Sequence, residues 1–279
     1  PTWPQGVPAP KGKHAIPAEL NWELWLGTAP SRNYNPAYLP AIWRGWVDFG
    51  TGSLGDMGCH FIDVPYRALK LGYPVAVETS VGSVYTGFFE EAIYPDSYPP
   101  SAKTHIQFPA RKNMPAVEMV WYDGGIRPKR PVELLPDEEM GEYDGGIIFD
   151  GTKGKIMAGL FGRNPTLLPT RKMKETDLPK SKFDFVEGGT EGHQQQWVKA
   201  CKQGFGAYTS SSFDKSGPLT ETVLMGNLAV HSYNHFETDA KGNRKFNGRK
   251  QLLWDGENMR ITNFEPANQF VKRTYRGGW

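Results

Sequence analysis

The chain has 279 residues, and its 32 lysines and arginines nearly balance its 30 aspartates and glutamates, for a net charge of +2. This balance, without a long block of like charge, argues against a nucleic-acid-binding surface. Because no apolar run reaches the roughly 18 residues that a membrane span needs, we expect no membrane-spanning helix.

Glycine and proline are unusually frequent, with 32 and 23 copies. Together they make up about a fifth of the chain, against about 12 per cent in average proteins, so a loop-rich domain is expected. Only two cysteines occur, Cys59 and Cys201, and each falls within a predicted helix. A disulfide framework is therefore not expected, and both thiols are predicted to be buried. The cysteines leave the cellular compartment open.

Residues 1–42 are predicted to form an arm and a loop, and residues 43–279 one large domain. The arm is rich in proline and also contains Trp3, Trp22 and Trp25. Because a flexible linker rarely contains tryptophan, the arm is expected to lie over an apolar surface.

A tyrosine-rich loop at residues 31–40 leads directly into Trp43 and Arg44. Aromatic rings stack on the C–H faces of sugars and a guanidinium group donates hydrogen bonds to hydroxyls, so this combination suits a sugar or polyol. Tyr34, Trp43 and Arg44 are therefore predicted to bind substrate. The alternative is that these rings belong to the core or to an oligomer contact.

Asp56, His60 and Asp63 stand at i, i+4 and i+7, so a helix would present all three on one face. Three interpretations remain open: a surface charge pair, a metal site and an acid/base pair. A metal site is disfavoured, because only Cys59 lies nearby and it points off this line. In the acid/base interpretation, His60 exchanges a proton and Asp56 orients its ring. We predict Asp56 and His60 as the catalytic residues and no metal ligands.

The same stretch contains Gly50-x-Gly52-x-x-Gly55, the spacing of a dinucleotide-binding loop. The preceding segment carries Arg44, Asp48 and two tryptophans, whereas a buried parallel strand should be a continuous aliphatic run. We therefore interpret the glycines as a structural turn and predict no cofactor-binding residue.

The sequence after residue 74 predicts strands and hairpins, followed by helices. Strands are expected to begin at Val75 and at residues 103–108 and 116–122, with a long loop at 90–101 and a hairpin around residues 150–154. Helices are expected at residues 191–203 and 220–231, short strands at 251–254 and 259–261, and a closing helix at 266–275. His231 is predicted to interact with the dipole at the end of its helix. These elements predict an α+β fold: a mostly antiparallel open β-sheet with helices packed on one face.

The motif Trp-Arg-Gly-Trp-x-Asp-Phe-Gly-Thr-Gly-x-x-Gly-Asp-Met-Gly-x-His at residues 43–60 resembles the second domain of the bacterial glucose–fructose oxidoreductase, inositol dehydrogenase and rhizopine-catabolism (Gfo/Idh/MocA) oxidoreductases. Similar segments lie at residues 22–27, 29–30, 34–38, 218–224 and 275–279. The resemblance carries a catalytic Asp-x-x-x-His pair onto Asp56 and His60. It also implies an N-terminal Rossmann domain and a Glu-Lys-Pro motif with a catalytic lysine, neither of which precedes Trp22. We therefore expect this chain to be the second half of a longer protein.

The resemblance implies the substrate-binding and catalytic half of an NAD(P)-dependent oxidoreductase that acts on a sugar or polyol hydroxyl. The NAD or NADP is expected in the full-length parent protein and not on this chain, which is expected to be inactive alone. Two alternatives remain: an NAD-assisted glycoside hydrolase, and a non-catalytic carbohydrate-binding or oligomerisation module. Strand 116–122 has apolar residues on both faces, which predicts a homo-oligomer formed through the sheet.

Overall fold

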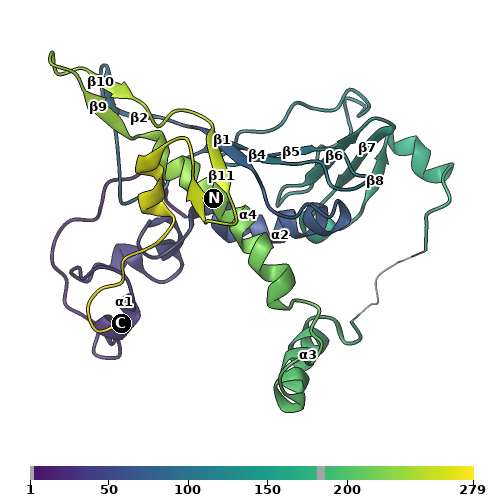
Figure 1. Ribbon diagram of the computed structural model, residues 1–279, viewed down its shortest axis with the longest axis horizontal. Coiled ribbons are helices and arrows are strands. Elements are labelled where there is room, and N and C mark those ends of the chain that lie inside the picture. Colours follow the sequence, from purple (N-terminus) through teal and green to yellow (C-terminus); the bar gives the residue numbers. More distant parts are fainter. Residues whose placement is uncertain (1–2, 181–185) are drawn as a thin grey trace. The chain divides into compact units, whose positions relative to one another are not determined.

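The computed structural model describes residues 3–180 and 186–279, which form two compact units (Figure 1). Unit 1 comprises Pro1–Lys129 and Glu221–Trp279, and unit 2 comprises Arg130–Thr220. Unit 1 thus contains the proline-rich arm, the main sheet and the candidate site residues. In the described part of the chain, no helix is both long enough and apolar enough to cross a bilayer.

The main sheet lies in unit 1 and has five antiparallel strands in the order β12-β11-β1-β4-β5. These strands are β1 (Ala76–Val81), β4 (Ala102–Phe108), β5 (Val117–Tyr122), β11 (Leu252–Asp255) and β12 (Arg260–Ile261). The sheet is open, and the predicted α+β class with a main antiparallel sheet is confirmed. One face of the sheet is buried and the other is partly exposed. On β4, alternate residues from Ala102 to Phe108 are buried, and the residues between them are only partly covered.

Two helices pack on the buried face of this sheet, α2 (Gly52–Ala68) and the unit 1 part of α4 (Phe213–Tyr233) (Figure 1). Glycine allows the close approach: a Cβ on Gly226 of α4 would lie 2.0 Å from the Leu54 side chain of α2. On α2, Phe61 meets Trp121 of β5 with ring centroids 6.0 Å apart. The helices and the sheet enclose the sheet core, which consists of Leu71, Val77, Ile106, Phe108, Met225, Ala229, Leu252, Trp254, Ile261, Phe264 and Ala267.

The arm forms a second apolar cluster in unit 1. It contains α1 (Trp22–Leu26) and the 3₁₀ helices η1 (Pro36–Tyr38) and η2 (Ala41–Gly45). Asn21 caps α1, because its side chain accepts a hydrogen bond from the Leu24 amide at 3.0 Å. We call the group the aromatic cluster: buried Trp22, Leu26, Tyr38 and Trp46, with Val7, Leu20, Trp25, Tyr34, Leu39 and Phe49 packed against them.

Two hairpins project from unit 1. One joins β2 (Val84–Gly87) to β3 (Glu90–Ala92), and the other joins β9 (Phe236–Thr238) to β10 (Arg244–Phe246). The expectation of an uninterrupted loop at residues 90–101 is therefore wrong, because its first residues pair with β2. The second hairpin was not predicted, since its strands have three residues each and are mostly exposed.

The described part of unit 2 contains a three-stranded antiparallel sheet, one complete α-helix and the first turns of α4. The strands are β6 (Ile147–Gly151), β7 (Gly154–Ala158) and β8 (Thr166–Leu168), the helix is α3 (Gly189–Gln203), and η3 (Leu160–Gly162) and η4 (Thr170–Lys174) are short 3₁₀ turns. The β6–β7 hairpin confirms the turn predicted at residues 150–154. Gly204, with a φ of 93°, ends α3 directly after the last residue of the helix predicted at 191–203.

Two further predictions are wrong. Both cysteines are exposed, because Cys59 points away from the buried stripe of α2 and α3 has no buried residue. The closing helix is only a 3₁₀ turn, η5 (Glu265–Phe270). Beyond it, Arg273 and Arg276 bind carbonyl groups near residues 47 and 27, and these long-range bonds replace a local helical pattern.

Candidate functional site

The glycine turn between η2 and α2 sets the position of the candidate site. Gly52 begins α2 with a φ of +64°, and a Cβ there would lie 2.6 Å from the Tyr98 ring. A Cβ on Gly50 would lie 2.5 Å from the backbone oxygen of Arg44. Only glycine satisfies both the backbone conformation and the close packing at Gly52. This turn brings η2 against the first turns of α2.

The Gly-x-Gly-x-x-Gly pattern does not have the surroundings of a phosphate-binding loop. The 3₁₀ helix η2 precedes it in place of a strand. Its amides are engaged within the turn: Gly50 N–H donates to the Trp46 carbonyl at 2.8 Å, and Gly55 N–H donates to the Thr51 carbonyl at 3.1 Å. The Gly50 and Gly55 amides are therefore not available to a ligand, and the strand that precedes a dinucleotide-binding loop is replaced by η2.

Arg44 connects η2 to the polar face of α2. Its Nε donates to Oδ1 of Asp56 at 2.9 Å, and its Nη1 donates to the Ala41 carbonyl at 3.2 Å. The guanidinium also lies 4.7 Å from the centre of the Trp43 ring and 5.7 Å from that of Trp3. Both partners of the ion pair are partly covered, so the pair is firmer than an exposed surface pair. Three of the predicted site residues, Trp43, Arg44 and Asp56, are thus in one contiguous group.

His60 follows Asp56 by one turn on α2 and is half-buried. The helical spacing places the two side chains on the same face, and the hydrogen bond between them remains a prediction. Asp63, the third residue of this face, pairs with Arg67 through a 2.7 Å contact between Oδ1 and Nε. The candidate reacting group is therefore Asp56 and His60, with Arg44 beside Asp56.

Tyr34 belongs to the aromatic cluster. Its ring meets Trp22 edge-on at 5.3 Å with an interplanar angle of 80°. Tyr34 thus takes part in a packing contact, which was the alternative interpretation of these rings.

An open pocket of about 360 Å³ with aromatic walls lies in unit 1. Its lining comprises Trp25, Leu26, Gly27, Thr28, Ala29, Trp43, Asp48, Phe49 and Arg273. Of the predicted site residues, only Trp43 is part of this lining. The only sequence signal was the density of tryptophan in the arm, because the lining comes from three segments that are distant along the chain.

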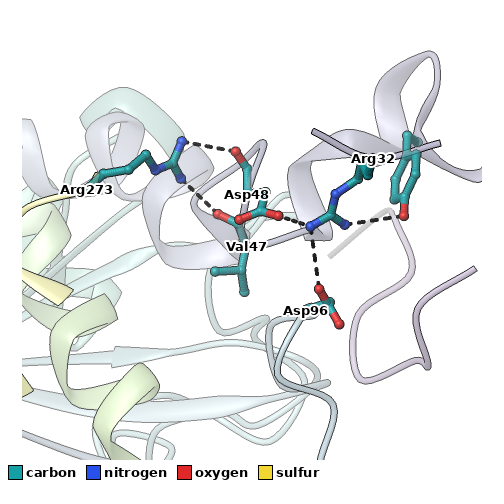
Figure 2. A network of polar contacts seen from close by, with 6 residues as sticks. Arg32, Val47, Asp48, Asp96 and Arg273 are labelled. Carbon is teal, nitrogen blue, oxygen red and sulfur yellow. Dashed lines mark hydrogen bonds and ion pairs between the residues drawn. The ribbon is translucent and has the colours of Figure 1, made fainter. Parts of the chain in front are cut away.

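A charged network holds these segments together (Figure 2). Arg32 pairs with the Asp48 carboxylate, and its Nη2 lies 3.6 Å from Oδ1 of Asp96. Arg273 donates from its two terminal nitrogens to the carbonyl oxygens of Asp48 and Val47, at 3.0 and 3.1 Å (Figure 2). Residues from the arm, from the turn before α2 and from the C-terminal segment are therefore fixed at one place.

His231 does not have the predicted role at the helix end. Burial, reinforced by the positive charge of Arg273, lowers the pKa of His231 to about 4, so its ring is neutral at pH 7. Its Nε2 lies 3.3 Å from the Tyr98 hydroxyl, and its ring stacks on Phe270 with centroids 5.2 Å apart. A neutral ring adds no charge to the helix dipole, so the expected interaction with that dipole is wrong.

The part of the chain that the structure describes contains no group of three or more histidine, cysteine, aspartate or glutamate residues that could hold a metal ion. No curated protein matches the chain. Residues 9–83, which include most of the arm and also Trp43, Arg44, Asp56 and His60, match the Gfo/Idh/MocA family model described as oxidoreductase family, C-terminal alpha/beta domain.

Proposed function

We propose that this chain is the substrate-binding and catalytic half of an NAD(P)-dependent oxidoreductase that acts on a hydroxyl group of a sugar or polyol. The observation that carries the proposal is the contiguous group of Trp43, Arg44 and Asp56, one helical turn from His60, within the segment that matches the oxidoreductase model. A hydroxyl oxidation needs a group that removes the hydroxyl proton, and histidine performs this role near neutral pH.

In this proposal His60 accepts the proton of the substrate hydroxyl. Asp56 keeps the imidazole in the tautomer that leaves one ring nitrogen able to accept that proton. Arg44 fixes the Asp56 carboxylate through the 2.9 Å contact and is itself held by the Trp43 ring and the Ala41 carbonyl. Arg44 and Trp43 would contact the substrate through the free edge of the guanidinium and the exposed part of the indole.

Residues 50–55 are not part of the proposed cofactor site, since a 3₁₀ helix in place of a strand precedes them and the Gly50 and Gly55 amides donate within the turn. We propose that a Rossmann domain outside this sequence holds most of the NAD or NADP in the parent protein. The residues of this chain then bind the substrate, orient its hydroxyl and accept its proton.

The direct test is His60→Ala in the protein that contains this chain and its nucleotide-binding domain. Turnover, followed as sugar-dependent reduction of NAD or NADP, should fall by roughly 10² to 10⁴, the usual contribution of a positioned acid/base group. His193→Ala is a matched control, because His193 is exposed on α3 of unit 2. Turnover within threefold of wild type in a folded His60→Ala protein would contradict the catalytic role.

We further propose that the chain forms a homo-oligomer through the face of the sheet opposite α2 and α4. Strand register places Glu78 beside His105, and His105 beside Val120. The same face carries Lys103 and exposed Leu253, so with Glu78 it combines charges of both signs with apolar side chains. Such a surface can be complementary to its own copy across a two-fold axis.

Light scattering at micromolar concentration tests this association. The expected mass is at least twice the chain mass of 31.2 kDa. Val120→Arg should reduce it to the monomer mass, because the substitution places a charge in the apolar part of the face. Leu24→Arg is the control, since Leu24 is 64% exposed on α1, away from the sheet. A monomer mass for the wild-type chain would refute the association.

A further inference from the structure

The open pocket of unit 1 has the size and the lining of a small-molecule site. Its volume of about 360 Å³ lies within the range of about 300–1,000 Å³ that is typical of ligand pockets. Three aromatic residues, Trp25, Trp43 and Phe49, form part of its wall. Neither Asp56 nor His60 lines it, so the pocket is distinct from the candidate reacting group.

The aromatic walls are fixed from behind. Trp25 stacks on buried Trp22 with ring centroids 4.7 Å apart and an interplanar angle of 10°. Phe49 meets Trp25 at 4.8 Å and Tyr38 at 5.1 Å, both edge-on. Because these rings are held by the aromatic cluster, they need no rearrangement to receive a ligand, and the entropy cost of binding is correspondingly small. Flat apolar walls of this kind suit the C–H face of a sugar ring.

The polar part of the lining comprises a carboxylate, a guanidinium group and a hydroxyl, so it can both donate and accept hydrogen bonds. One carboxylate oxygen of Asp48, Oδ2, accepts a hydrogen bond from Arg32. Among the described residues, the other oxygen, Oδ1, has no hydrogen-bond partner. Each terminal nitrogen of Arg273 makes one bond to a carbonyl and retains a second N–H (Figure 2). Thr28 adds a hydroxyl to the lining.

This charge pattern discriminates between ligand classes. The Asp48 carboxylate disfavours a phosphate or another anion, and the Arg273 guanidinium disfavours a cation. A neutral ligand with several hydroxyls can accept from Arg273 and donate to Asp48 at once. Carbohydrate rings combine this edge of hydroxyls with an apolar face.

Trp43 connects the pocket to the candidate reacting group. Its indole lines the pocket, and the Arg44 guanidinium that contacts this ring binds Asp56. We propose that the pocket binds one neutral carbohydrate ring, with Trp25 and Phe49 as its stacking wall and Asp48, Arg273 and Thr28 as its hydroxyl-binding edge. The proposal rests on the proposed function, because it treats the pocket as the subsite that anchors the sugar beside Asp56 and His60.

Binding of methyl β-D-glucopyranoside and cellobiose, measured by saturation-transfer NMR and tryptophan fluorescence on the full chain, tests the pocket without requiring turnover. Trp25→Ala should weaken binding roughly tenfold or more, since it removes a stacking wall. Thr28→Val, which removes only the hydroxyl, should weaken binding roughly threefold to tenfold. This variant tests the pocket even if Trp25→Ala does not fold. Leu24→Ala, on the exposed side of the same helix, should leave affinity unchanged.

The outcomes separate this proposal from the proposed function. His60→Ala should retain sugar affinity within twofold even where it abolishes turnover in the parent protein. If His60→Ala loses binding while Trp25→Ala and Thr28→Val keep it, the sugar binds elsewhere and the pocket proposal is overturned, whereas the proposed function stands. Absence of binding of both sugars to the wild-type chain at 50 mM, roughly the weak limit of a specific small-molecule site, would also overturn it.

Discussion

The sheet core and the aromatic cluster are both apolar, but they are held together in different ways. The sheet core is mostly aliphatic, and Val77, Ile106, Leu252 and Ile261 are fully buried. The aromatic cluster surrounds a charge: the Arg32 guanidinium lies 5.2 Å from the centre of the Phe49 ring. Aliphatic packing therefore dominates the sheet core, where Phe264 and Trp254 are the members that contact charged side chains among the described residues, Lys250 and Glu221 respectively. The aromatic cluster instead has an ion-paired arginine among its rings.

This difference corresponds to a division of roles. The sheet core supports α2, which carries Asp56 and His60, and contributes no residue to the open pocket. The aromatic cluster forms the pocket wall, and its charged network joins the segments that line the pocket (Figure 2). Changes in the sheet core should therefore alter global stability, and changes in the cluster should alter the pocket together with its sensitivity to pH and salt.

The largest effect is expected in the sheet core. Ile106→Ala should lower the free energy of unfolding by about 2–5 kcal/mol, because it leaves a cavity among fully buried residues. Urea unfolding followed by far-UV circular dichroism measures this loss. Leu24→Ala on α1 is the control: its side chain is 64% exposed and lies outside the sheet, so a change below about 0.5 kcal/mol is expected. Equal losses in both variants would contradict the picture of a packed aliphatic core.

The next effect concerns pH at His231, which contacts Tyr98 and Phe270 and has Arg273 nearby. The pKa of His231 is lowered from 6.5 to about 4, so the unfolded chain gains a proton on this residue at a higher pH than the folded chain does. The contribution to stability is complete above pH 6.5 and is lost as the pH falls toward 4.

Between pH 7 and pH 4.5 this linkage should cost about 2 kcal/mol of unfolding free energy. Carboxylates also titrate in this range, so the informative quantity is the difference between wild type and His231→Phe. The variant should lose about 2 kcal/mol less over the same interval, and Tyr98 keeps its 3.2 Å hydrogen bond to the Gly50 carbonyl. Identical pH profiles of urea unfolding in the two proteins would show that His231 is not buried in its neutral form.

A smaller effect is expected at the charged network. Arg32→Met should lower the free energy of unfolding by about 1–2 kcal/mol, since it removes the partly buried partner of Asp48. Salt screens this ion pair, so the wild-type chain should lose unfolding free energy between about 0.1 and 1 M sodium chloride, and Arg32→Met should lose less of it over the same range. Asp63→Ala removes the more exposed pair with Arg67 and should cost only about 0.3–0.5 kcal/mol. A similar small loss in Arg32→Met would mean that aromatic packing alone holds the cluster.

The elements that the sequence predicted well are those with a strong local pattern. Alternating residues identified β4 and β5, glycine identified the end of α3, and the helical spacing of Asp56 and His60 placed both on one face of α2. These features depend on residues a few positions apart, so local periodicity and turn chemistry suffice. The direct Arg44–Asp56 ion pair joins side chains that are 12 residues apart and separated by a glycine turn, so local spacing does not specify it.

The sequence by itself determined the α+β class, the antiparallel strands, the polar face of α2 and the interpretation of the glycine pattern as a turn. Tertiary structure decided which side chains meet: Arg273 reaches residues 47 and 48, His231 is enclosed by Tyr98 and Phe270, and three distant segments form the open pocket. The physical reason is that hydrogen-bond periodicity is local along the chain. Burial, desolvation and pocket shape depend on which remote segments pack together. The local spacing of residues in the sequence does not specify this packing.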